Sequence, residues 1–200
     1  MSRVNGVSKA LRYVAFGLTL LFAVFGTAFI VGSTMMDPGG VPAVVLSVSW
    51  FVPMIVLVVF ALRRPDAATV VLAVVAAFVA VFVVLDALFG LVPTDEIGPV
   101  ASITVFAVAV ALGFLGLHRP ARAGGLLLLL GTANLVGVFV TMLESGTGPP
   151  DATLGGSSSA VAVPVLIIGG LLLLAASRKP GPDHDARDGT GRGNRVGSAR

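Results

Sequence analysis

Asp86 is the only acidic residue well inside a hydrophobic run of this sequence, where Val83-Val84-Leu85 precede it and Ala87-Leu88-Phe89 follow it. A charge in hydrocarbon is unfavourable by roughly 2.5–3.5 kcal/mol on insertion scales, so such residues commonly face a partner or a water-filled cavity and mark ion or proton sites. Counted from Ala67, however, Asp86 lies ~28 Å along its predicted helix, close to the outer interface, where this cost falls. The depth favours an interfacial or hydrogen-bonded carboxylate, and an ion or proton site is the alternative.

Asn134 lies near the middle of another apolar run, within the segment Gly131-Thr132-Ala133-Asn134-Leu135-Val136-Gly137. Helical spacing puts Gly131, Asn134, Gly137 and Thr141 roughly on one face, and Ala133 and Gly137 form a small-xxx-small pair. On antiparallel helices Asn134 should lie at about the depth of Ser49 or Thr104. The pattern favours close helix packing with a hydrogen bond across the interface over a contact to a substrate.

Pro53 interrupts a third apolar run shortly after Trp50. A proline inside a helix removes one backbone hydrogen bond, here the one to the carbonyl of Ser49, and a kink is expected. Trp50 is expected at mid-depth, facing other helices or a cavity instead of the headgroups. Kinked helices can line transport paths, but proline is also common in membrane helices without that role, and we favour the second interpretation.

The apolar runs lack the residue types that enzymes and metalloproteins commonly use for catalysis or metal binding. The chain has no cysteine, which excludes disulfides, thiol catalysis and thiolate metal sites. Its two histidines, His118 and His184, are expected in a loop and in the C-terminal tail, so neither can serve as a buried haem or metal ligand. A cation site among the acids of the outer loops is disfavoured. When basic residues are kept on the cytoplasmic side, the outer loops are left with an excess of acidic residues that need not bind a cation. We expect no enzymatic activity, no cofactor and no metal site.

The composition identifies the class of protein. Of the 200 residues, 56% are hydrophobic and only 12% are charged, whereas a soluble chain carries about 25% charged residues. About 20 apolar residues suffice for a helix to cross a bilayer. Six such runs predict an all-α, polytopic membrane bundle over 11–177, with helices at about 11–31, 42–62, 67–91, 100–117, 123–143 and 158–176. The first run is longer than the core of a cleaved signal peptide, so we expect it to be retained.

The charges of the connections alternate along the chain. All 13 Lys and Arg residues fall in the N-terminal segment 1–10, at Arg12, in the second and fourth connections, or in the tail 178–200. The other three connections carry only acids, at Asp37, Asp95, Glu96, Glu144 and Asp151. Because basic residues near short loops stay in the cytoplasm, both termini are expected in the cytoplasm. Arg is far more frequent than Lys in this chain, which suggests a bacterial protein, so the membrane is expected to be the bacterial cell membrane. A sequence pI of 10.2 then reflects these anchors, and no nucleic-acid binding is inferred.

Three basic-proline motifs follow the even-numbered runs, namely Arg63-Arg64-Pro65, His118-Arg119-Pro120 and Arg178-Lys179-Pro180. They are consistent with a threefold repeat of a two-helix hairpin, such as occurs in transporters. The favoured alternative is that any helix leaving the membrane inward needs a basic residue and often stops at proline. Asp66, just beyond the first motif, is expected to cap the third helix.

The tail at 178–200 is rich in Gly, Asp and Arg and has no apolar periodicity, so we expect it to be disordered. Taken together, the residues favour a non-enzymatic membrane protein that acts as an accessory or partner-binding component. Its expected partners are the lipid bilayer, other membrane proteins or further copies of itself. The alternative is a small-solute or ion transporter or channel with a path near Asp86, Asn134 and the Pro53 kink.

Overall fold

The computed structural model describes residues 2–36, 40–91, 100–145 and 157–177 and folds them into six α-helices. These are α1 (Ser2–Met36), α2 (Gly40–Arg63), α3 (Pro65–Phe89), α5 (Val100–Leu115), α6 (Pro120–Ser145) and α8 (Ser157–Ser177). The part of the chain that the structure describes contains no strand. The prediction of an all-helical chain with six helices is confirmed. The predicted tail at 178–200 lies outside the described residues, as do Asp37, Asp95, Glu96 and Asp151.

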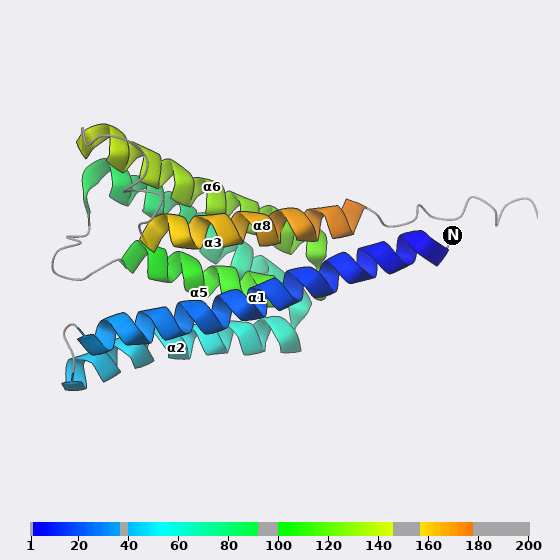
Figure 1. The fold of residues 1–200 in the computed structure, drawn as a ribbon, viewed down its shortest axis with the longest axis horizontal. Helices are drawn as coiled ribbons and strands as arrows, with labels where there is room; N and C mark the ends of the chain where they lie inside the picture. Colours follow the sequence, from blue (N-terminus) through cyan, green and yellow to red (C-terminus); the bar gives the residue numbers. More distant parts are fainter. Residues whose placement is uncertain (1, 37–39, 92–99, 146–156, 178–200) are drawn as a thin grey trace, which may run out of the picture.

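Helix α5 occupies the centre of the bundle (Figure 1). It packs against each of the other five helices, which follow one another around it in the order α1, α2, α3, α6, α8 and back to α1. A helix that is apolar on every side must be covered on every side, and α5 carries no charged residue. Eight of its side chains are at most 3% exposed: Val105, Phe106, Val108, Ala109, Val110, Ala111, Leu112 and Leu115.

The helix boundaries follow from proline and glycine. Pro65 and Pro120 are the first residues of α3 and α6, where the missing N–H of proline costs nothing because the first turn of a helix has unpaired amides. The first two basic-proline motifs therefore mark the start of the following helix. At the other end of α3, Gly90 adopts a left-handed conformation (φ 58°), and its N–H donates to the carbonyl of Asp86 at 2.8 Å.

Helix α1 begins at Ser2 and is longer than the predicted span 11–31. Its 35 residues correspond to ~52 Å, well above the ~30 Å hydrocarbon thickness. The additional N-terminal turns extend past the ends of the neighbouring helices (Figure 1). Residues 2–10 are thus helical and belong to α1.

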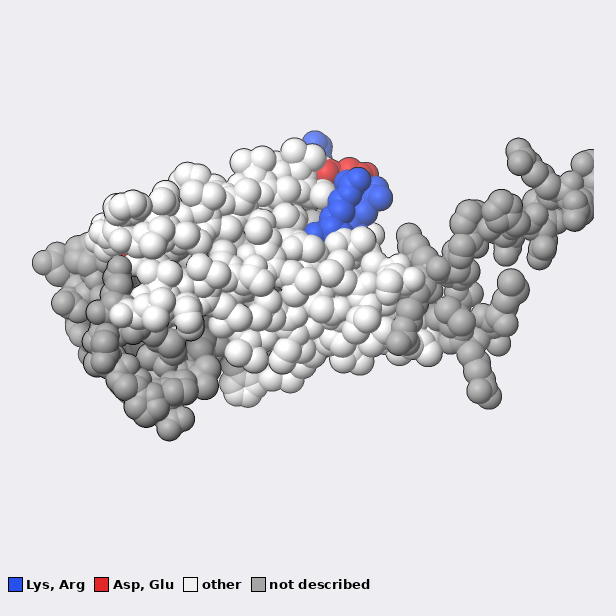
Figure 2. Space-filling model, turned by 90° about the horizontal axis from the view of Figure 1, so that it is seen from above, with Lys and Arg blue, Asp and Glu red and all other residues white. Residues whose placement is uncertain are grey.

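The described Lys and Arg side chains gather at one end of the bundle, here called the basic end: Lys9, Arg12, Arg63, Arg64, Arg119 and Arg122. In the view of Figure 2 the blue atoms lie at that end with red atoms beside them, and nearly all of the remaining described surface is white, without Lys, Arg, Asp or Glu. The helices around α5 expose large apolar side chains along their length, including Phe25 (68%), Phe78 (72%) and Phe139 (61%). Four helices are long and apolar enough to cross a membrane: α1, α3, α6 and α8.

The predicted hairpins α1–α2, α3–α5 and α6–α8 do occur as packed pairs. They are not placed equivalently, however, because α5 is central whereas its counterparts α2 and α8 lie in the outer ring. The arrangement of the helices therefore lacks the threefold symmetry that a simple hairpin repeat would produce.

Candidate functional site

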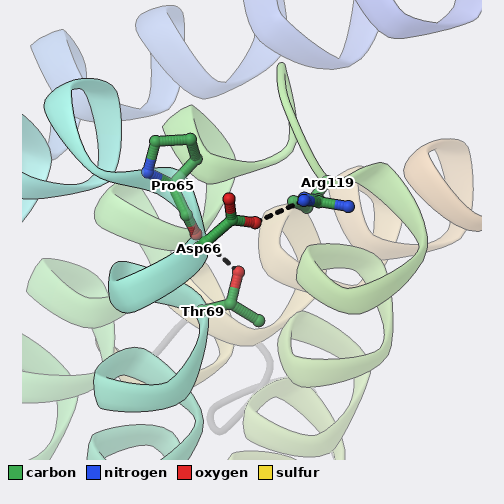
Figure 3. Close-up of polar contacts among 4 residues, drawn as sticks. All are labelled: Pro65, Asp66, Thr69 and Arg119. Atoms are coloured by element: carbon green, nitrogen blue, oxygen red, sulfur yellow. Dashed lines mark hydrogen bonds and ion pairs between the residues drawn. The ribbon is translucent and has the colours of Figure 1, made fainter.

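Asp66 and Arg119 form an ion pair between two turns of the basic end (Figure 3). Asp66 is in the first turn of α3, and Arg119 directly precedes α6. The pair is solvent-accessible, with side-chain exposures of 77% for Asp66 and 47% for Arg119. An exposed pair of this kind contributes at most about 1 kcal/mol. Its structural effect is to connect the α2–α3 turn to the α5–α6 turn.

The expectation that Asp66 caps α3 is wrong. The residue preceding α3 is Arg64, and no side chain donates or accepts a capping hydrogen bond there. Because Pro65 occupies the first helical position, Asp66 falls one residue inside the helix, where its carboxylate reaches Arg119 instead. Thr69, one turn further along, donates its hydroxyl to the carbonyl of Pro65 at 2.7 Å.

Two side chains of α1 bind the ends of neighbouring helices at the basic end. Ser8 Oγ donates to the carbonyl of Ala175 in α8 at 2.8 Å, and Arg12 Nη1 donates to the carbonyl of Leu117 after α5 at 3.4 Å. The last carbonyls of a helix have no partner within the helix and carry partial negative charge, so hydroxyl and guanidinium donors suit them. Sequence reasoning missed these contacts. The available signal was the spacing of four residues, which puts Ser8 and Arg12 on one face of α1.

Asp86 lies in the last turn of α3, just before the Gly90 cap, and is half-buried. It is 21 residues beyond Pro65, which corresponds to ~31 Å along α3 from the basic end. Asp86 is therefore close to the end of α3 that is remote from the arginines.

Asn134 is 4% exposed on α6, between two close helix contacts. On one side, Gly131 faces Leu166 of α8; on the other, Gly137 faces Val83 and Ala87 of α3. The α3 segment that meets Gly137 is the one that carries Asp86. The structure thus brings Asp86 and Asn134 to neighbouring levels of the α3–α6 interface.

Ser102 in the first turn of α5 is another buried polar residue, with 5% exposure, at the level of Asn134. It lies 13 residues before Leu115, and Asn134 lies 14 residues after Pro120, so both are about 20 Å from the basic end on packed, antiparallel helices. Sequence reasoning considered Ser49 and Thr104 at this depth but not Ser102.

Trp50 and Pro53 lie on α2, separated from α6 in the ring by α3. Helix α2 continues as one helix through Pro53, whose side chain is exposed, and Trp50 is half-buried. The four candidate residues therefore form two groups: Asp86 with Asn134, and Trp50 with Pro53. The second group does not converge with the first.

Helices α6 and α8 approach each other closely at a glycine pair that we did not predict. A Cβ added at Gly124 of α6 would lie 2.9 Å from the carbonyl oxygen of Gly169 in α8, and one added at Gly169 would lie 3.1 Å from the oxygen of Gly124. Backbone thus meets backbone where α6 and α8 cross. The doublets Gly124-Gly125 and Gly169-Gly170 were the available sequence signal.

Within the described residues, no three His, Cys, Asp or Glu side chains gather into a group that could hold a metal ion. Comparison of the chain with protein-family models, with curated proteins and with solved structures gives no significant match.

Proposed function

We propose that this chain is an integral protein of the cell membrane whose six helices all cross the bilayer, with both termini in the cytoplasm. Three observations support the proposal: the four long apolar helices, the uncharged surface between the two ends, and the gathering of described Lys and Arg at the basic end. Helix α5 has only 16 residues, or ~24 Å, which is short for a lipid-facing span. It is enclosed by the other helices, so its ends need not reach the headgroups.

We further propose a non-enzymatic role as an accessory or partner-binding component of the membrane. The observation that carries this proposal is the position of α5, because it fills the axis along which a pore through the bundle would run. The side chains of α5 that point into the neighbouring helices, from Val105 to Leu115, are buried there and occupy this axis. What remains available is the outer surface of the ring, which is suited to binding lipid or another membrane protein.

Transport is the second candidate function, and the placement of Asp86 and Asn134 is the observation that favours it. A carboxylate and a buried amide at neighbouring levels of one helix interface are the kind of groups that bind a proton or a small cation between helices. Such a path would run between α3 and α6, beside α5 instead of through it.

Reconstitution into vesicles loaded with a pH-sensitive dye discriminates the two candidates. An accessory role predicts that vesicles with the protein acidify at the rate of empty vesicles when a proton gradient is imposed. Transport predicts faster acidification by the wild-type chain, and loss of that increment in Asp86→Asn. The conservative control Thr132→Val changes an exposed residue of α6 whose hydroxyl bonds only the carbonyls of Leu128 and Leu129 in its own helix, and it should not alter the rate in either case.

A further inference from the structure

A hollow of about 500 Å³ lies along the outer side of α2 at the basic end. Its lining consists of Ile55, Val56, Val59, Phe60, Arg63 and Arg64. These residues form two adjacent rows with helical spacing of four, Ile55–Val59–Arg63 and Val56–Phe60–Arg64. Each row is apolar for two positions and ends in an arginine.

The apolar part of the hollow faces outward. Ile55, Val56 and Val59 are 55%, 59% and 42% exposed, although they belong to a helix whose other side packs on α1, α3 and α5. In a bilayer, this stripe is in contact with acyl chains, and the hollow provides a track about 12 Å long from Ile55 to Arg63.

The two arginines at the end of the track are available for an anion. Both are exposed, and no described carboxylate pairs with either of them. The nearest described acid in sequence, Asp66, is already paired with Arg119. Arg119 and Arg12 differ in this respect, since Arg119 is paired with Asp66 and Arg12 donates to the carbonyl of Leu117.

We propose that this hollow binds one anionic phospholipid of the cytoplasmic leaflet, with its phosphate at Arg63 and Arg64 and one acyl chain along Ile55, Val56 and Val59. Guanidinium groups bind phosphate oxygens through paired, charge-assisted hydrogen bonds, and the cytoplasmic leaflet supplies anionic lipid. The apolar track and the two adjacent cations match the two halves of such a lipid. The inference rests on the proposed membrane topology, which puts the basic end at that leaflet.

Trp50 is the only tryptophan of the chain and lies on the other side of α2 from this stripe, whereas Val52 is 53% exposed one turn before Val56. In the variant Trp50→Phe/Val52→Trp, the fluorescence of the single tryptophan therefore reports lipid next to the hollow. The full chain is reconstituted into two sets of phosphatidylcholine vesicles. In the first set, a small share of the phosphatidylcholine carries bromine on its acyl chains. In the second set, a small added share of phosphatidylglycerol carries the bromine instead. Bromine quenches tryptophan on contact. Site binding predicts that brominated phosphatidylglycerol quenches the tryptophan of this variant at a share on the order of tenfold lower than brominated phosphatidylcholine does.

The double variant Arg63→Gln/Arg64→Gln should abolish this preference while leaving quenching by brominated phosphatidylcholine unchanged. The matched control Arg122→Gln removes an exposed arginine of α6 at the same end and should retain the preference. Equal quenching by both lipids, or equal loss in the two variants, would overturn the lipid site. If instead a second copy of the chain covered the hollow, neither lipid would quench and the protein would migrate as a dimer, which also overturns it. A chain that fails to enter the vesicles would contradict the membrane topology itself, and flotation of the vesicles distinguishes that outcome.

Discussion

Asn134 is a buried amide on α6, a helix that packs against α3, α5 and α8. Asp66 and Arg119, by contrast, are exposed at the basic end and join two turns. Asn134 is expected to contribute to stability through a hydrogen bond from which water is excluded. Asp66 and Arg119 are expected to contribute through a weak charge interaction. The burial of Asn134 between small residues follows a pattern that is visible in the sequence. The partner of Asp66 could not be predicted, because it depends on how closely two turns approach after all six helices have packed.

Replacement of Asn134 by Leu should lower the thermal stability of the protein in detergent. The substitution removes an amide from a position that is 4% exposed, and hydrogen bonds between membrane helices contribute about 0.6–2 kcal/mol. The measurement is the unfolding midpoint followed by circular dichroism. The exposed Thr132→Val on the same helix should leave the midpoint unchanged. An unchanged midpoint in Asn134→Leu would remove the packing role.

The Asp66–Arg119 pair should show a small coupling energy. In a double-mutant cycle with Asp66→Asn and Arg119→Gln, we expect at most about 1 kcal/mol, decreasing as salt is added, because both side chains are largely in solvent. Chemical denaturation of the four proteins gives the coupling. A value of several kcal/mol that salt does not change would show that the pair is desolvated in the protein, against its exposure in the structure.

At the scale of helices, sequence patterns identified the six elements but not their contacts. Runs of apolar residues predict where helices occur, since about 20 such residues must be helical to enter a bilayer. Helix α1 begins before its apolar run, and there Ser8 binds the end of α8, a tertiary contact that the apolar pattern does not report. The central position of α5 could not be predicted either, because a helix that is apolar on all sides has the same sequence pattern whether protein or lipid covers it.

The crossing of α6 and α8 leads to a prediction with an adjacent control. Gly124→Ala should be destabilising by about 1–3 kcal/mol, since the new methyl group would meet the carbonyl oxygen of Gly169 and push the two backbones apart. Gly125→Ala, one residue further, meets nothing within 4 Å and should be neutral or slightly stabilising. Thermal unfolding in the same detergent compares the two. Equal effects of both variants would contradict the close approach of α6 and α8.

At the scale of the whole molecule, one helix is enclosed by five. This arrangement explains how a short span can be stable in a bundle, because α5 packs against all five of the other helices. It also turns the outward faces of the other helices toward the surrounding medium, which suits a protein that acts through its surface.

Enlarging a side chain of α5 tests the enclosure. Ala111→Leu should be destabilising by about 1–3 kcal/mol because Ala111 is fully buried, whereas Ala28→Leu on the exposed side of α1 should have little effect. The unfolding midpoints of the two variants in detergent give the comparison. A tolerated Ala111→Leu would show that α5 has a free side.

The proposed topology fixes the side of the membrane on which each connection lies, and cysteine labelling measures that side directly. Because the chain has no native cysteine, single cysteines can be placed at Asp37, Asp95 and Asp151, in the acidic connections, and at His118, between α5 and α6. Intact cells expressing each variant are treated with a membrane-impermeant maleimide. Six crossings with both termini inside predict labelling of Asp37→Cys, Asp95→Cys and Asp151→Cys in intact cells, and labelling of His118→Cys only after the cells are opened. Labelling of His118→Cys in intact cells, or protection of any of the other three, would contradict the proposed topology.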